Sequence, residues 1–108
     1  MYKVSIRNAE TNELLFNVNT EMLHLEVRKS TDSSATSILY DVTFAIPNDG
    51  AQSCITTLEP IINTNVNLEI YKDSNKLFSN NDNPLSLENV GSNLGGIIEE
   101  LHIVFRKG

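Results

Sequence analysis

The sequence is poor in cysteine, and Cys54 is its only thiol. A single cysteine cannot form an internal disulfide, so the chain does not resemble the disulfide-stapled domains that are common among small secreted proteins. Residues 1–7 alternate polar and apolar side chains, and no run of about 18 apolar residues occurs. We therefore expect neither a signal peptide nor a membrane span, and we predict a soluble protein that is cytoplasmic as synthesised.

Positive charge is scarce as well. Eight lysines and arginines stand against 14 acidic residues, which gives a formal net charge of −6 and a pI near 4.7. Tight binding of nucleic acid needs an excess of basic residues to neutralise phosphates, so this class of function is disfavoured. An acidic surface that lines a passage and repels DNA without holding it remains compatible with this charge. The 108 residues suffice for a single domain over residues 1–108 with one modest core.

What the sequence does contain is a regular alternation of apolar and polar residues, which is typical of half-buried β-strands. The clearest example is Ile38–Ile46. The other expected strands are Tyr2–Ile6, Leu14–Val18, Leu23–Val27, Val66–Ile70, Lys76–Phe78, Leu85–Leu87 and Ile97–Lys107. We predict a mainly β fold of about seven or eight strands, either a β-sandwich or a small β-barrel. A barrel with a helix across it is preferred, because closure removes exposed strand edges.

One short α-helix is expected near residues 50–59, where the alternation stops. Four apolar residues there follow the spacing of a single helical face: Ala51, Cys54, Ile55 and Leu58. Asp49 is expected to cap the helix, with Gln52 as its capping-box partner. Pro60 should end the helix, because proline lacks a backbone donor. About ten residues are too few for an independent helix, so it must pack on the sheet.

Three segments are expected to be irregular. Lys29–Ser37 is small and polar, and it lies between two strong strands. Asn80–Pro84 has the composition of a loop. Gly91–Gly96 is too rich in glycine for regular structure, so we interpret it as a flexible tip.

Residues with catalytic potential are few and scattered. Cys54 lies on the apolar stripe of the expected helix, which favours core packing over a nucleophilic role. His24 and His102 lie on polar strand faces, where they could bind zinc only if the fold brought them together with Glu26 or Glu100. The sequence has no His-Glu-x-x-His or paired Cys-x-x-Cys spacing. We therefore predict surface histidines and no metal site.

Glu99 interrupts the apolar face of the last strand. A buried carboxylate without a partner is costly, so a strand end, a β-bulge or a basic partner is expected there, and the bulge is preferred. Glu100 lies on the opposite face, so the two carboxylates cannot act as an acid/base pair. Because no catalytic constellation emerges, we predict a non-enzymatic protein without a cofactor.

The order of the expected elements resembles that of a known family. A long strand is followed by a short helix after Pro47–Gly50, by the strand Val66–Tyr71, by a hairpin and by the closing strand Ile97–Lys107. Over about Leu23–Lys107 this order resembles the tube-forming β-barrel of phage tails and contractile injection systems. The resemblance implies non-enzymatic subunits that stack as rings and continue a sheet from one protomer to the next. It also implies an acidic lumen through which DNA or cargo slides.

The resemblance also implies a candidate inter-subunit loop, because tube subunits carry an extended hairpin between protomers. Its residues here are Lys29, Ser30, Thr31, Asp32, Ser33, Ser34, Ala35, Thr36 and Ser37. The implied partners are copies of the chain and other structural proteins. The leading interpretation is therefore a homo-oligomeric subunit of a phage virion or injection apparatus, with connector and capsid-decoration proteins as related options.

Acidity also supports a function of another class. Small acidic proteins such as nuclease immunity proteins and phage anti-defence proteins inhibit basic partners through charge complementarity. This alternative requires acidic residues to gather on one face, drawn from Glu10, Glu13, Glu21, Glu26, Asp32, Asp41, Glu69, Asp73 and Asp82. A sugar- or ligand-binding sandwich ranks third, because the chain has no tryptophan and only three tyrosines to anchor a ligand.

Overall fold

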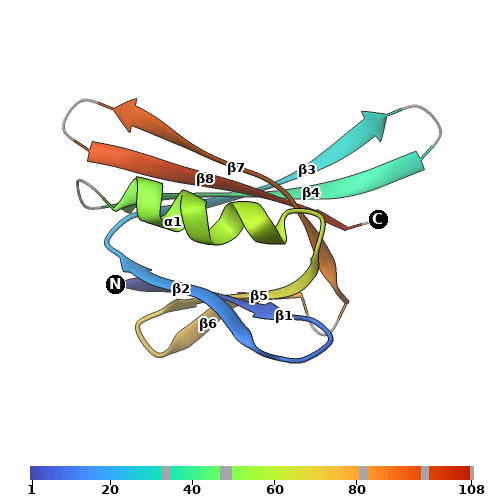
Figure 1. Cartoon of the computed structure of the whole chain (residues 1–108), viewed down its shortest axis with the longest axis horizontal. Coiled ribbons are helices and arrows are strands. Elements are labelled where there is room, and N and C mark those ends of the chain that lie inside the picture. The colour runs from blue at the N-terminus through green and yellow to red at the C-terminus, as the bar shows by residue number, and fades with distance from the viewer. Residues whose placement is uncertain (33–34, 47–49, 81–82, 96–97, 108) are drawn as a thin grey trace.

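The computed structural model describes residues 1–32, 35–46, 50–80, 83–95 and 98–107. Within these ranges, eight strands form one antiparallel sheet and one short helix packs beside it (Figure 1). The strands are β1 (Tyr2–Asn8), β2 (Leu14–Thr20), β3 (Leu23–Asp32), β4 (Ala35–Ile46), β5 (Asn65–Lys72), β6 (Asn75–Ser79), β7 (Leu85–Gly95) and β8 (Ile98–Lys107). The predicted mainly β fold with one short helix is confirmed.

The sheet bends into two layers. Its strand order is β2-β1-β5-β7-β8-β4-β3, and β6 pairs with β5. β5 and β7 meet through the two residue pairs Asn65↔Ser86 and Val66↔Leu85. At this narrow junction the sheet turns from a lower layer of β1, β2, β5 and β6 to an upper layer of β3, β4, β7 and β8 (Figure 1). The end strands β2 and β3 form no ladder with each other in the described ranges, so the fold is an incompletely closed barrel.

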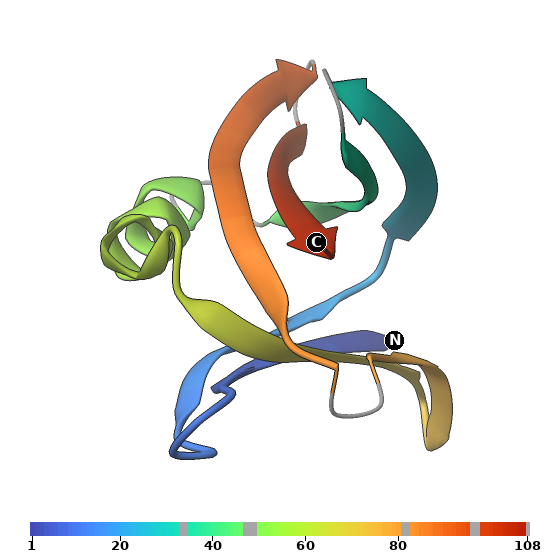
Figure 2. The same cartoon turned by 90° about the vertical axis from the view of Figure 1, so that its right-hand side faces the viewer.

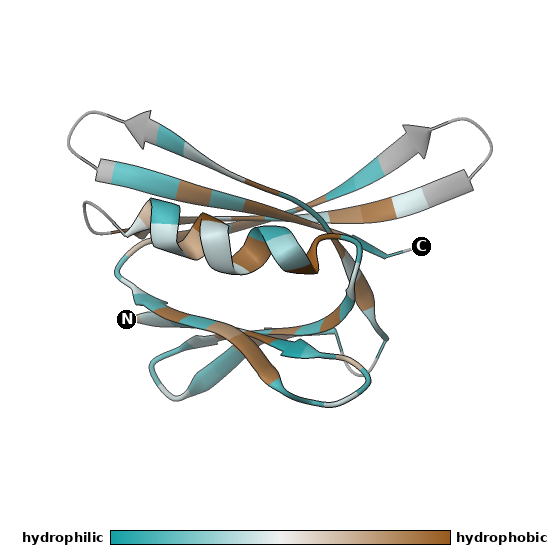
Figure 3. Cartoon of the chain, in the orientation of Figure 1, coloured by the Kyte–Doolittle hydropathy of each residue, from teal (hydrophilic) through white to brown (hydrophobic). Residues whose placement is uncertain are grey.

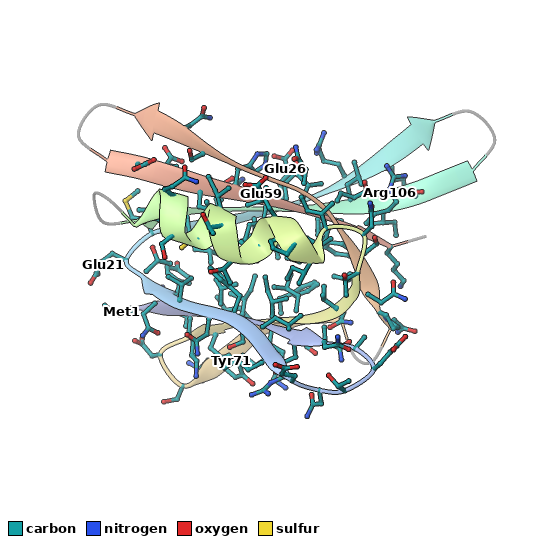
Figure 4. All side chains as sticks on the ribbon, viewed as in Figure 1. Met1, Glu21, Glu26, Glu59, Tyr71 and Arg106 are labelled. Carbon is teal, nitrogen blue, oxygen red and sulfur yellow. The ribbon has the colours of Figure 1, made fainter. Side chains whose placement is uncertain are left out.

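The core lies between the two layers. Hydrophobic and hydrophilic positions alternate along the strands (Figure 3), and side chains fill the space between the layers (Figure 4). Strand side chains with at most 1% exposure come from both layers: Val4, Ile6, Val66, Leu68 and Ile70 below, and Val42, Phe44, Leu85, Leu87, Leu101, Ile103 and Phe105 above. Burial of each such side chain stabilises the fold by about 1.5–3 kcal/mol, which helps to offset the conformational entropy that the chain loses on folding.

Helix α1 (Ala51–Leu58) closes one side of this barrel. Ala51 and Leu58 are buried, while Cys54 and Ile55 are partly buried against the core, as the apolar stripe predicts. The helix contacts β2 of the lower layer and β7 and β8 of the upper layer. Figure 2 shows it on the opposite side of the molecule from β3. The helix therefore bridges the layers where the sheet leaves a gap.

The helix ends are close to the predicted positions. The N-cap residue is Gly50, and no side-chain hydrogen bond caps the helix at this residue. Asp49, the expected cap, lies outside the described residues. The amide of Gln52 donates to Thr56 Oγ1 at 3.4 Å. Pro60 lies in a 3-10 turn, η1 (Glu59–Ile61), that follows α1 directly. The α-helical part therefore ends before the proline, as expected.

Two segments predicted to be irregular are paired strands. Residues 29–32 continue β3 and residues 35–37 continue β4, with pairing through Asp32↔Ala35, while Ser33 and Ser34 lie outside the described residues. β7 likewise continues to Gly95, paired with Ile98, whereas Gly96 lies outside the described residues. In a hairpin each strand satisfies the backbone groups of the other, so a ladder can continue through small polar residues of low β-propensity. The alternation of side chains therefore predicts both strands to be shorter than they are, because it carries no information on backbone pairing.

Candidate functional site

Two hairpins extend beyond the core in opposite directions (Figure 1). The buried apolar side chains of β4 lie between Val42 and Ile46, and those of β8 lie between Leu101 and Phe105. We call residues 30–32 and 35–37 the β3–β4 arm, and residues 91–95 and 98–100 the β7–β8 arm. The arms make the molecule elongated, with a long axis of 41 Å against 30 and 25 Å.

The candidate inter-subunit segment lies at the end of the β3–β4 arm. Lys29, Ser30, Thr31 and Asp32 belong to β3, Ala35, Thr36 and Ser37 belong to β4, and Ser33 and Ser34 lie outside the described residues. The described residues of the segment are therefore paired strands, which corrects the expected loop. Ser37 is buried, and its hydroxyl accepts a hydrogen bond from Arg106 Nη1 at 3.1 Å. This contact ties the base of the arm to β8.

The outer face of the upper layer contains a buried carboxylate. Asp41 is only 7% exposed, although its side chain alternates with the inward-facing Val42 on β4. Arg28 Nε on β3 lies 2.6 Å from Asp41 Oδ2, and His102 Nε2 on β8 lies 3.7 Å from Oδ1. Within the described residues, Oδ1 has no hydrogen-bond partner. The hydrogen bond to Asp41 and the charge of that carboxylate raise the pKa of Arg28, so the guanidinium stays protonated beside it.

His24 and His102 lie on the same face and at the same level of the sheet. Both are directly opposite Thr43, His24 from β3 and His102 from β8, so that residue separates them. His102 is turned to Asp41 rather than to a shared metal position. No group of three or more potential metal ligands occurs in the described part of the chain. The arrangement thus lacks the tetrahedral ligand set that a structural zinc site requires.

The ladder of β8 shows no register shift at Glu99, so the preferred bulge there is wrong. Glu99 is the second residue of β8 and is partly buried, which fits the alternative of a strand end. The bulge lies in β7 at Glu88 instead. An extra residue in one strand re-aims a side chain, and Glu88 here forms an ion pair with Arg106 on the outer face.

Charge is separated along the upper layer. Four of the eight basic residues lie at neighbouring levels at the base of the β3–β4 arm: Arg28, Lys29, Arg106 and Lys107. Glu99 and Glu100 lie at the base of the other arm, and Glu21 lies in the short β2–β3 connection. Figure 4 labels Glu21 and Arg106 at opposite ends of the molecule. Arg28 and Arg106 are ion-paired with Asp41 and Glu88, so the charge contrast between the two ends rests on Lys29 and Lys107.

A cavity of about 400 Å³ opens at the acidic end, lined by residues of β1, β3, β4 and β8 and of the β2–β3 connection. Tyr2, Leu23 and Phe44 contribute its apolar wall, and the exposed carboxylates of Glu21 and Glu100 lie at its rim. The volume is within the range of small-ligand pockets. Its acidic rim fits a basic group better than an anion.

Cys54 does not have the surroundings of a nucleophile. Its side chain packs against the core from α1 and is only partly accessible. Burial raises the pKa of the thiol above its ordinary value, so it is protonated at neutral pH. A thiol that is not ionised is a poor nucleophile, which favours the core-packing interpretation.

Cys54→Ser should lower the free energy of unfolding by about 1 kcal/mol, because the hydroxyl loses hydration on partial burial. Urea denaturation followed by circular dichroism measures this change, and Ser53→Ala on the exposed face of the helix is the matched control. The oligomeric mass in solution should be the same for both variants. Unchanged stability with altered assembly would instead place Cys54 at an interface.

Reasoning from the sequence missed the pairing of Asp41 with Arg28. The available signal is an aspartate within an otherwise strong strand, since aspartate is depleted in strands. The signal does not identify the partner, because the β3–β4 register that brings Arg28 beside Asp41 is not encoded in either strand alone.

Comparison with protein-family models, with curated proteins and with solved structures finds no significant match. The resemblance to tail-tube subunits therefore rests on element order alone. Among the described residues, no helix has both the length and the apolarity needed to cross a membrane.

Proposed function

We propose that this protein is a non-enzymatic assembly subunit that binds copies of itself through its hairpin arms. The observation that carries the proposal is the pair of arms that extend past the core in opposite directions (Figure 1). The β4–β8 ladder ends at Ile38↔Lys107, so among the described residues the end of the β3–β4 arm has only two strands. A two-stranded hairpin is at best marginally stable in water. Arms of this kind gain stability when a neighbouring subunit covers them, which favours a role in assembly.

Charge separation supports contact between unlike ends of neighbouring copies. Lys29 and Lys107 at the base of the β3–β4 arm complement the acidic end that contains Glu21, Glu99 and Glu100. Contact between different surfaces of identical subunits is heterologous, and its repetition produces rings or filaments. The element order suggests the setting, a phage virion or contractile injection apparatus in which the chain acts as a tube-like, connector or decoration subunit.

Shortening the β3–β4 arm should reduce the assembly to smaller species while the subunit stays folded. We would replace residues 31–36 by Asn-Gly, because Ser30 and Ser37 lie directly opposite each other and this dipeptide closes a two-residue hairpin. Light scattering coupled to size exclusion measures the mass over a range of protein and salt concentrations. Negative-stain imaging of the largest species shows whether it is a ring, a tube or a closed oligomer.

The matched control introduces the same dipeptide into the β5–β6 turn, as Asp73→Asn with Ser74→Gly. Asp73 has a positive φ of 56°, which asparagine tolerates, and the turn lies on the lower layer away from both arms. The control should assemble like the native chain. A native chain that is monomeric at every concentration contradicts the proposed self-assembly.

The alternative of an acidic inhibitor receives less support from the structure. Three of the acidic residues that it needs are engaged in ion pairs: Asp41 with Arg28, Glu69 with Lys76 at 3.2 Å, and Asp73 with the terminal amine at 3.0 Å. Glu10, Glu13, Glu21, Glu26 and Asp32 belong to separate hairpins and connections, and Asp82 lies outside the described residues. A monomer that binds a basic protein in a salt-dependent manner would restore this alternative.

A further inference from the structure

One edge of β3 is free of any partner strand among the residues that the structure describes. In the described part of the structure the strand pairs with β4 on one side and with no strand on the other. Its ladder has no register shift, and its ten residues include neither proline nor glycine. Natural edge strands are often shortened, bulged, covered or interrupted by proline, which prevents pairing with another chain. β3 has none of these four features. Its only protection against pairing is its charged side chains, which include Glu26, Arg28 and Lys29.

The other free edges are less suited to pairing. β2 has seven residues and contacts α1, and β6 has only five residues. β7 is bulged at Glu88 and also contacts α1. Figure 2 shows β3 on the side of the molecule away from the helix. A second chain can therefore approach β3 without displacing part of the fold.

The backbone of β3 presents hydrogen-bonding groups to this edge at alternate residues. Ala45 N–H donates to the carbonyl of Met22 at 3.1 Å, just before the strand begins. In an antiparallel ladder, residues bonded to the partner strand alternate with residues whose N–H and C=O point away. The even-numbered residues of β3 therefore bond to β4, and the odd-numbered residues, with Val27 near the centre, present their groups to the open edge.

We infer that β3 pairs antiparallel with β3 of a second copy, about a two-fold axis at Val27. The inference rests on the proposed function, because it names one contact through which copies assemble. At the axis, Val27 N–H donates to the carbonyl of Val27 in the second copy, and the reverse bond forms by symmetry. Leu25 and Lys29 of the two copies form the next pairs. Such a contact is isologous, so it closes as a dimer that serves as the building unit of the assembly.

The side chains across this axis have complementary charges. The two-fold places Glu26 directly opposite Arg28 of the second copy, and it does so twice. These are non-hydrogen-bonded pairs, in which side chains on one face approach each other most closely. Both residues are exposed on the outer face. The guanidinium of Arg28 has several donors, so it can bind a second carboxylate while it stays paired with Asp41.

An apolar strip on the inner face leads to the same axis. Val27 is 57% exposed and lies directly opposite Tyr40 on β4. The Tyr40 ring contacts the Phe78 ring of β6, with centroids 5.2 Å apart. In the dimer the two Val27 side chains lie side by side and extend this strip across the interface. Pairing thus covers an apolar side chain that is exposed in the single chain.

The first test compares two lysine substitutions at apolar residues of similar exposure. Val27→Lys places like charges at the axis, whereas Leu77→Lys changes a residue of β6 that is 54% exposed. Analytical ultracentrifugation of the full chain should show a dimer dissociation constant raised about tenfold or more by Val27→Lys and unchanged by Leu77→Lys. Both residues are exposed, so circular dichroism should show that both variants are folded.

The second test exchanges charges between copies. Glu26→Arg places arginine opposite arginine, and Arg28→Glu places glutamate opposite glutamate, so each variant alone should dissociate. The Arg28→Glu variant also carries Asp41→Asn. Without this second substitution, the introduced glutamate would lie beside the buried carboxylate of Asp41. A mixture of the two variants makes every pair across the axis complementary again. The mixture should form a heterodimer with an affinity close to that of the native dimer.

The outcomes separate this inference from the proposed function. A native oligomer that is insensitive to Val27→Lys, or two charge variants that do not complement each other, overturns the β3 pairing and leaves assembly through other surfaces standing. A native chain that is monomeric throughout overturns both. The two-fold contact is established if Val27→Lys weakens the dimer while Leu77→Lys does not, and if the mixture of the two charge variants recovers dimer affinity.

Discussion

Phe105→Ala should lower the free energy of unfolding by about 3–5 kcal/mol. Phe105 is fully buried in β8 and lies level with Tyr40 on β4 and Leu87 on β7. Removing the ring forfeits the free energy of its transfer from water to the core, and it leaves a cavity between the two layers. Because β8 is paired with a strand on each side, it cannot move inward to fill that cavity. A domain of this size is stable by about 5–15 kcal/mol in total, so the loss is a large fraction of it.

Urea denaturation followed by circular dichroism measures this change, because small single domains unfold in one cooperative step. Leu77→Ala is the control: Leu77 is 54% exposed, and the substitution should change stability by no more than about 0.5 kcal/mol. An equal effect of the two substitutions would contradict a core between the layers at Phe105.

Arg28→Met should destabilise the chain, whereas Arg28→Met combined with Asp41→Leu should restore most of the stability. Asp41 is largely buried and Arg28 is its nearest cation, at 2.6 Å. Removing one partner leaves a desolvated carboxylate, and an unpaired buried polar group costs about 1–3 kcal/mol or more. Replacing both partners by apolar side chains removes that penalty, because neither charge then has to be desolvated.

A double-mutant cycle of unfolding free energies measures this coupling. Lys29→Met is the control, since Lys29 is the next residue of the same strand, is exposed and faces the other side. It should have little effect on stability. The cycle is measured at protein concentrations where each variant is monomeric, so that association does not contribute. Equal destabilisation by the single and double replacements would show that Asp41 does not depend on Arg28.

Much of the fold follows from patterns that are local in the sequence. The alternation in Ile38–Ile46 predicts a strand with one buried face, and Val42, Phe44 and Ile46 are buried there. The stripe of Ala51 and Leu58 likewise predicts the buried face of α1. These predictions succeed because the period of an element and the burial of its apolar face are both set by neighbouring residues.

Pairing between strands does not follow from such patterns. Residues 29–32 and 35–37, which the sequence predicts to be part of a loop, form a ladder because β3 and β4 satisfy each other's backbone groups. The bulge lies at Glu88 rather than Glu99, because its place depends on how β7 aligns with β8. A shift of one residue in register would turn each side chain to the other face, so no single strand specifies its partner's alignment.

The mainly β class, the place of the short helix and the acidic charge all follow from the order of the amino acids. Three further features depend on contacts between distant segments: the missing ladder between β2 and β3, the hairpin arms and the pairing of Asp41 with Arg28. The two groups differ in the range of the interactions that produce them. Periodicity acts within a few residues, whereas register, closure and ion pairs depend on contacts between segments far apart in the chain.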